Sequence, residues 1–93
     1  MLVILPSKLS VKDTVALGKL NSWKTIAEGA SWKTIMDVKA TIASVSGGVK
    51  NIYTIFNIGG NDYRLVIIID YETQMILVED LLTHSDYDKW NKK

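Results

Sequence analysis

The chain has 93 residues, of which 47% are hydrophobic and 23% charged, and its formal net charge is +1. This length allows one small domain, so we treat residues 1–93 as a single domain and exclude a second independent one. The absence of cysteine excludes disulfide frameworks, thiolate zinc sites and cysteine nucleophiles, and a single histidine leaves little for a histidine-based metal site.

Charge and hydropathy narrow the choice of partner. No apolar run reaches the roughly 18 residues that a membrane span requires, so we expect a cytoplasmic protein with no membrane contact. The net charge hides an asymmetry, because residues 1–50 carry +4 and residues 51–93 carry −3. We therefore expect an anion-binding surface to draw on the first half of the chain.

The first half is predicted to be mainly helical. A short apolar run, Leu2 to Leu5, is stopped by Pro6 and predicts a first strand. An apolar stripe with helical spacing then runs behind two possible N-caps, Ser10 and Asp13, and can be closed by Gly29. The stripe consists of Ala16, Leu20, Trp23 and Ala27.

A second, shorter helix is predicted to begin at Thr34. Thr34 and Asp37 have the spacing of a capping box, and Ile35, Val38 and Ile42 follow at i, i+3 and i+7. The glycine-rich stretch at residues 44–51, SVSGGVKN, is interpreted as a loop.

After residue 51 the pattern changes to the alternation of β-strands. Three β-rich segments at residues 52–58, 61–70 and 75–82 are separated by stretches short enough for hairpins. The middle segment is apolar on both faces, so we expect a central strand that is covered by helices on one side and by something else on the other. The sequence predicts an α+β domain of order β-α-α-β-β-β, with an antiparallel meander.

Two side chains near the predicted sheet have reactive chemistry. Arg64 interrupts an apolar strand, where its guanidinium either pairs with a carboxylate (Asp70, Glu79 or Asp80) or awaits an anionic ligand. His84 lies at the end of the last predicted strand, where it is either a capping or surface group or a proton-transfer group. A guanidinium, an imidazole and the phenol of Tyr87 near one cleft are what phosphodiester cleavage without a metal needs.

Other features have structural explanations. Gly59-Gly60 lies between strands and lacks a following GK[ST], so a hairpin turn is favoured over a phosphate loop. The carboxylates have no metal-ligand spacing, and we expect neither a metal ion nor another cofactor. The pentapeptide SWKTI occurs twice, but Trp23 falls in the apolar stripe and is predicted to be a core residue, so the two copies are expected to have different roles.

From Ser31 onward, three motifs occur in a recognisable order: WKTIMDVK, FNIGGNDYRLVIIIDYE and THSDYDK. In their order and intervals they resemble the HigB family of bacterial type II toxins, relatives of the RelE and ParE toxins. The resemblance covers approximately residues 30–90. It implies a RelE-like fold, in which helices pack on one face of a small curved antiparallel sheet.

The resemblance also implies an activity and partners. Members of this family are endoribonucleases (mRNA interferases) that cut mRNA, usually on the ribosome and without a metal, and so inhibit translation and growth. Each is neutralised by an antitoxin, here a HigA-like protein with a helix-turn-helix domain, through which alone the toxin would reach operator DNA.

Residue by residue, the resemblance assigns roles to the motif side chains. Arg64 would hold the scissile phosphate, His84 and Tyr87 would transfer protons, and Asp88 would orient one of them. The resemblance places Lys33 and Lys39 on the RNA backbone, and we expect Lys50 and Lys89 to join them. The sequence does not decide which group is the acid and which the base.

Two alternatives remain open at this point. Acidic residues at Asp62, Glu79 and Asp80 suggest a catalytically weakened module that pairs with a regulatory antitoxin without cleaving RNA. A ParE-like toxin acting on gyrase is a further alternative, but it would give His84 and Tyr87 no evident task.

Overall fold

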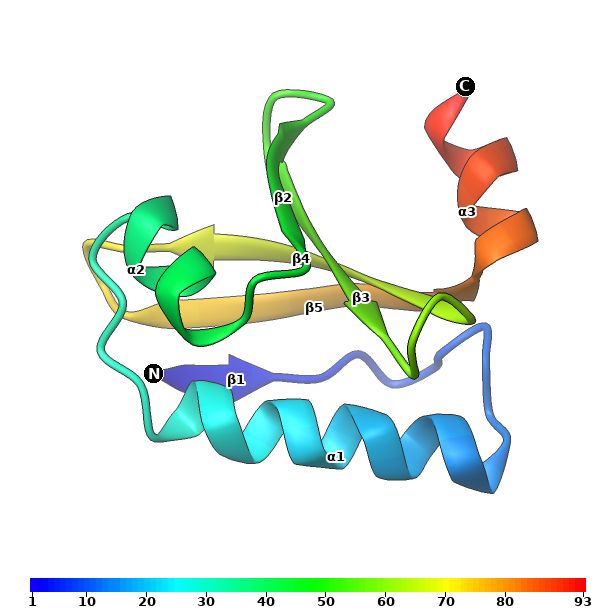
Figure 1. Ribbon diagram of the computed structural model, residues 1–93, viewed down its shortest axis with the longest axis horizontal. Helices are drawn as coiled ribbons and strands as arrows, with labels where there is room; N and C mark the ends of the chain where they lie inside the picture. Colours follow the sequence, from blue (N-terminus) through cyan, green and yellow to red (C-terminus); the bar gives the residue numbers. More distant parts are fainter.

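Five strands and three helices form an α+β fold in the computed structural model, which describes residues 1–93 (Figure 1). The strands form one open sheet of order β1-β5-β4-β3-β2. In chain order the elements are β1 (Leu2–Ile4), α1 (Thr14–Glu28), α2 (Ile35–Thr41), β2 (Val45–Val49), β3 (Tyr53–Ile58), β4 (Tyr63–Asp70), β5 (Met75–Thr83) and α3 (His84–Asn91). The predicted α+β class and the predicted pair of helices before the main strands are confirmed. None of the three helices is long and apolar enough to cross a membrane.

The direction of β1 differs from the prediction. The resemblance implies an antiparallel sheet, but β1 pairs in parallel with β5, with Leu2 opposite Met75 and Ile4 opposite Leu77. The sheet is therefore mixed. A strand of three residues carries no pattern that identifies its neighbour or its direction, because both depend on the path of the chain through α1.

The interpretation of residues 44–51 as a loop is wrong. Val45–Val49 forms an edge strand antiparallel to β3, with Val45 opposite Phe56 and Val49 opposite Tyr53. The register shifts between Ser46 and Val49, where Gly47-Gly48 occupies an irregularity of the bulge type, and Gly48 has a φ of 69°. Glycines lower the β propensity of the segment, but a bulge accommodates them at low cost.

The hairpin between β3 and β4 matches the prediction. The strands are joined through Gly59 and Gly60, whose φ angles of 64° and 69° lie in the left-handed region that glycine adopts without strain. The pair is thus a turn between antiparallel strands, as expected.

The C-terminal segment differs from the prediction, because His84 begins a helix instead of ending a strand. The hydroxyl of Thr83 accepts a hydrogen bond from the backbone N–H of Asp86 (3.1 Å), which is an N-cap of ordinary geometry. The sequence signal was a threonine followed three residues later by an acidic residue, at the start of THSDYDK.

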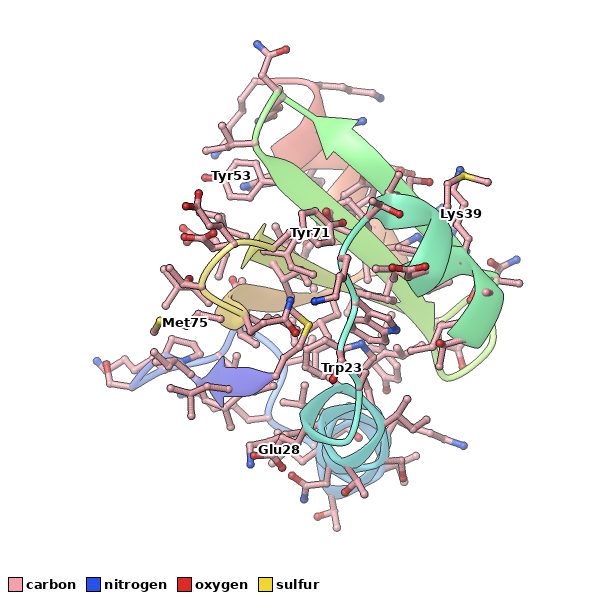
Figure 2. All side chains as sticks on the ribbon, turned by 90° about the vertical axis from the view of Figure 1, so that its left-hand side faces the viewer. Trp23, Glu28, Lys39, Tyr53, Tyr71 and Met75 are labelled. Carbon is pink, nitrogen blue, oxygen red and sulfur yellow. The ribbon has the colours of Figure 1, made fainter.

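The central strand β4 separates two hydrophobic clusters, as its two apolar faces predict. Leu65 and Ile67 belong to the larger cluster between the sheet and the helices α1 and α2, which also contains Trp23 at 3% exposure. Val66 points the other way and belongs to a smaller cluster with Ile55 and Leu82. The sequence predicts that an unspecified element covers the second face, and that element is α3, which packs through Tyr87 and Trp90. Trp23, between α1 and the sheet, is confirmed as a core residue (Figure 2).

Asp13 is the N-cap of α1 and also connects that helix to the sheet. Its carboxylate accepts hydrogen bonds from the backbone N–H of Ala16 (2.9 Å) and from the hydroxyl of Tyr63 (3.0 Å). Gly29 is the C-cap, as predicted. The capping box predicted for α2 is only partly formed, because Thr34 makes no side-chain cap bond and Asp37 accepts instead from the Lys33 N–H (2.9 Å).

The Asp13 cap makes stability depend on pH in a defined window. The backbone hydrogen bond from Ala16 is the main cause that lowers the pKa of Asp13 below its usual 3.8, so the carboxylate stabilises the fold above that pH. This contribution is lost as the pH falls through the lower pKa of the folded state. We expect Asp13→Asn to reduce the melting temperature at pH 7, and the difference from wild type to shrink below pH 3.8. Thermal melts at several pH values test this, and a difference independent of pH would contradict it.

Candidate active site

Arg64 and Tyr87 lie on the sheet face opposite α1 and α2, and His84 and Asp88 lie on the exposed side of helix α3, which covers that face. Arg64 is in β4 and alternates with Leu65, so its side chain projects to the face of Val66 and the smaller cluster. Asn57 of β3 and Leu82 of β5 are its neighbours across the strands. Helix α3 follows β5 directly and, like the β2–β3 hairpin, extends above the sheet (Figure 1).

Arg64 is a largely buried cation without a carboxylate partner. Its side chain is 8% exposed, and Nη1 donates hydrogen bonds to the carbonyl oxygens of Asn61 (3.1 Å) and Tyr63 (3.1 Å). The other guanidinium nitrogens have no hydrogen-bond partner in the protein, so they are available to an anion. Nη1 is thus fixed by backbone carbonyls, which orient the group without neutralising its charge.

The predicted ion pairs of Arg64 with nearby carboxylates are absent. Asp70 accepts the backbone N–H groups of Glu72 and Thr73 in its own turn, and Asp80 accepts the N–H and hydroxyl of Ser10. The only pairs within ion-pair distance are Lys24–Glu28 and His84–Asp88, and the second is an ion pair only when the imidazole is protonated. Of the two alternatives for Arg64, the structure therefore retains the anion-binding one.

His84 and Asp88 form a pair on the exposed side of α3. Their spacing of four residues places them on one helix face, and His84 Nε2 lies 3.7 Å from Asp88 Oδ2. Both side chains are about half exposed, at 52% and 54%. The two side chains are thus within ion-pair distance but not hydrogen-bonded, and solvent can reach both.

Tyr87 lies on the inner side of the same helix, packed against the smaller cluster. Burial raises the pKa of its phenol, the charge of Asp88 adds to that rise, and the guanidinium of Arg64 opposes it. Tyr87 and Arg64 share one face of the sheet, because Val66, which projects to the same face as Arg64, belongs to the cluster on which Tyr87 packs. Because the raised pKa lies above the ordinary value of 10.0, the phenol carries its proton at neutral pH.

Trp90 and Tyr53, which were not among the predicted site residues, hold α3 in place. The ring of Trp90 stacks on Tyr87 (5.7 Å between centroids) and meets Tyr53 of β3 edge to face (5.1 Å). Lys50 lies over the same indole at 4.1 Å, and its ammonium donates to the Trp90 carbonyl (2.6 Å). The sequence feature that could have revealed this contact is the three-residue spacing of Tyr87 and Trp90. This spacing places the two rings on one side only if the segment is helical.

Loss of Trp90 should loosen the helix that carries His84 and Tyr87. Each aromatic pair contributes about 0.5–1.5 kcal/mol, so Trp90→Ala should weaken local α3 stability by roughly 1.4 kcal/mol, a tenfold change in opening. We expect backbone amides of α3 to exchange roughly tenfold faster with deuterium, with β4 amides unchanged. Equal acceleration in both elements would mean that Trp90 supports the whole fold.

The four predicted RNA-binding lysines divide between the two faces. Lys50 contacts Trp90 beside the α3 face, and Lys89 is an exposed residue of α3 itself. Lys39 belongs to α2 on the opposite face, and Lys33 is exposed just before that helix. The structure therefore brings Lys50 and Lys89 to the side of Arg64 but does not bring Lys33 and Lys39 there.

Comparison with known proteins gives this arrangement a family. A model of the HigB_toxin family, described as the RelE-like toxic component of a toxin-antitoxin system, matches residues 16–90. The chain is 32% identical over 77 residues to the mRNA interferase toxin HigB of Escherichia coli K12. These aligned residues cover 82% of this chain and 68% of the relative. Proteins named mRNA interferase HigB from Escherichia coli O157:H7 and Shigella flexneri match with the same identity and coverage. With a match across most of its length and a fold of the expected α+β class, the chain belongs to the HigB family of RelE-like toxins of toxin-antitoxin systems.

Proposed function

We propose that this protein is an endoribonuclease that cleaves mRNA without a metal ion. The observation that carries the proposal is Arg64, a largely buried guanidinium with free donors and no carboxylate partner, beside the protonated phenol of Tyr87. The His84–Asp88 pair on the same helix supplies a second proton-transfer group. The names of the relatives, mRNA interferases, support the same activity.

The chemistry assigns one role to each group. Attack of a ribose 2′-hydroxyl on the adjacent phosphorus breaks the bond to the 5′-oxygen, giving a 2′,3′-cyclic phosphate and a 5′-hydroxyl end. Arg64 stabilises the charge that develops on the phosphoryl oxygens. Tyr87, whose phenol holds its proton at neutral pH, is assigned as the proton donor to the leaving 5′-oxygen, and His84, paired with Asp88, accepts the proton of the 2′-hydroxyl.

RNA would lie across the α3 face. Lys50 and Lys89 would contact the phosphate backbone, whereas the positions of Lys33 and Lys39 on the other side give them no contact with the strand being cut. We propose that the substrate is mRNA on the ribosome, in the cytoplasm. The partner is proposed to be a HigA-like helix-turn-helix antitoxin, through which alone the complex reaches operator DNA.

Induction of the protein in cells tests this function. We expect growth arrest together with new transcript 5′ ends that carry a hydroxyl, and both should be lost in His84→Ala. A matched control is Ser85→Ala, an exposed neighbour in the same helical turn, which should retain both effects. Arrest that persists in His84→Ala without new 5′ ends would point to a target other than RNA.

One observation favours a second candidate, a module that binds its partner without cleaving RNA. The carbonyl of Asp62 accepts the backbone N–H of His84 (3.0 Å), so an acidic residue lies at the start of α3, where an RNA strand would approach. In the same experiment this candidate predicts neither arrest nor new 5′ ends from the wild-type protein, while the protein still binds its antitoxin.

A further inference from the structure

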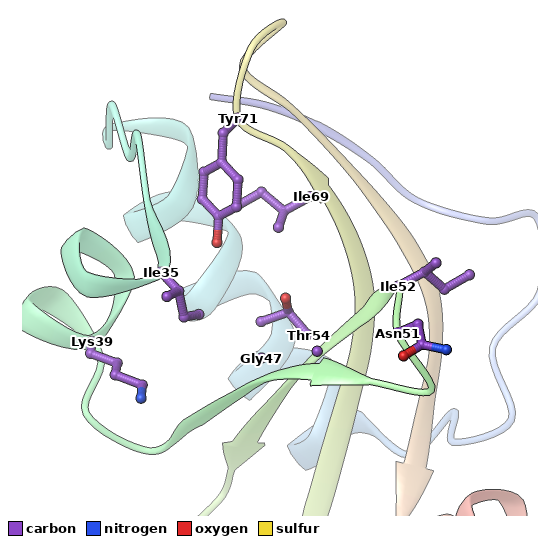
Figure 3. Close-up of a pocket in the computed structure, with 9 residues that line it drawn as sticks. Ile35, Lys39, Gly47, Asn51, Ile52, Thr54, Ile69 and Tyr71 are labelled. Carbon is purple, nitrogen blue, oxygen red and sulfur yellow. The ribbon is translucent and has the colours of Figure 1, made fainter.

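A pocket of 390 Å³ lies on the face of the sheet opposite Arg64. It is bounded by helix α2, the glycine segment of β2 and the ends of β3 and β4 (Figure 3). Thr54 lies at its base and alternates with Ile55 of the smaller cluster, so it faces the side of α1 and α2. The pocket is therefore separated from the proposed catalytic groups by the sheet itself.

Three hydrogen-bond donors converge on this space without a partner in the protein. Thr54 is buried at 4% exposure, yet its hydroxyl makes no hydrogen bond. The hydroxyl of Tyr71 and the ammonium of Lys39 are also free, and Figure 3 shows all three side chains directed between α2 and the sheet. None of the three atoms is sealed from solvent, because the only fully buried side-chain donor without a partner is Trp23 Nε1, so all three can be reached by a ligand in the pocket.

The lining identifies an anion as the complementary group. It contains Lys39 but no carboxylate, and burial raises the pKa of Tyr71, which keeps that phenol a donor. The charge of Asp37, which lies outside the lining, contributes to the rise in pKa, and its carboxylate accepts the backbone N–H of Lys33. A carboxylate can accept from an ammonium and two hydroxyls at once.

The shape and rim of the pocket favour a carboxylate attached to a protein. The walls include Ile35 and Ile69, and Ile52 at the rim is 57% exposed, although it is a large apolar side chain. Gly47 allows β2 to lie close to α2, because a Cβ there would be 3.2 Å from the Ile35 side chain. An aliphatic residue next to the carboxylate in a partner sequence would cover Ile52, which a small free anion would leave in water.

We propose that this pocket receives an aspartate or glutamate side chain of the partner antitoxin, with an aliphatic neighbour of that residue packed on Ile52. The proposal rests on the assignment of the chain to a toxin-antitoxin family. It concerns the opposite face from RNA cleavage, so the two can be tested separately.

The test is an NMR titration of the full chain with the capped peptide acetyl-Ala-Leu-Glu-Leu-Ala-amide and its glutamine counterpart. We expect the glutamate peptide to shift the amide signals of Gly47, Gly48 and Ile69, and to bind roughly tenfold more tightly than the glutamine peptide. Tyr71→Phe and Lys39→Met should each weaken this binding, whereas Lys33→Met, outside the pocket, should not.

Three results would overturn the proposal. Equal binding of the two peptides would exclude recognition of the carboxylate, and absence of shifts at the pocket would exclude the site. Sodium butyrate binding as tightly as the glutamate peptide would identify a site for small free carboxylates instead of a docking site. RNA cleavage by Tyr71→Phe should equal that of wild type, so failure of the nuclease proposal would be seen in that assay and not in the titration.

Discussion

Replacement of Arg64 by alanine is expected to lower the rate of RNA cleavage by about 10²–10³-fold, the usual effect of removing one preorganised donor for a developing charge. The size of the effect follows from the environment of the guanidinium. It is 8% exposed, held by the carbonyls of Asn61 and Tyr63, and no carboxylate offsets its charge. The measurement is single-turnover cleavage of an RNA oligonucleotide, with circular dichroism to establish that the variant is folded.

Two further variants make the Arg64 prediction decisive. Arg64→Lys keeps a positive charge but loses the planar set of donors, so we expect an intermediate rate even if the alanine variant folds poorly. Lys12→Ala removes one exposed cation distant from the site in sequence and should leave cleavage unchanged. Wild-type rates in Arg64→Lys, or equal losses in Arg64→Lys and Lys12→Ala, would show that Arg64 acts only through the general charge of the protein.

The parts of the fold that sequence predicted are those with a long, regular pattern. The stripe containing Trp23 and Leu20 predicts α1 because four apolar residues repeat with helical spacing, and the caps Asp13 and Gly29 limit it. The two apolar faces of β4 predict two hydrophobic layers, and both are present. In each case burial determines the side-chain pattern, so the pattern can be used to predict burial.

The parts that sequence missed depend on contacts distant along the chain. Strand β2 contains two adjacent glycines, and only pairing with β3 makes a strand of it. The direction of β1 is likewise determined by β5, some seventy residues later. Helix α3 has no buried residue of its own and is held to the sheet largely by aromatic contacts of Tyr87 and Trp90, so it lacks the apolar stripe that reveals α1.

The candidate site shows the same division. The resemblance of the motifs to HigB toxins indicated Arg64, His84 and Tyr87, and the structure places all three on one side of the sheet. Residue type alone could not predict on which face of the sheet Lys39 lies, because a positive charge is compatible with either face. Its position beside Thr54 and Tyr71 follows from the packing of α2 on the sheet, which no short motif encodes.

Trp23→Ala is expected to be the most damaging single change to stability, lowering the free energy of unfolding by about 3–5 kcal/mol. Trp23 is 3% exposed and meets Phe56 edge to face at 5.4 Å, so its removal leaves a cavity between α1 and the sheet. Urea denaturation monitored by circular dichroism provides the measurement. A typical domain is stable by only about 5–15 kcal/mol, so a loss of this size is a large share of the total.

A comparison of two substitutions at Trp23 separates the contribution of packing from that of the indole N–H. Trp23 Nε1 is buried and has no hydrogen-bond partner, which costs about 1–3 kcal/mol in the wild-type protein. Trp23→Phe removes this unpaired donor and retains an aromatic ring against Phe56, so the gain and the smaller cavity should nearly cancel, to within about 1–2 kcal/mol. Trp90→Ala serves as the matched control, because it deletes an indole from the partly exposed α3 contact and should cost much less than Trp23→Ala. If Trp23→Phe is as destabilising as Trp23→Ala, the indole N–H has a partner in solution and the packing argument for this residue fails.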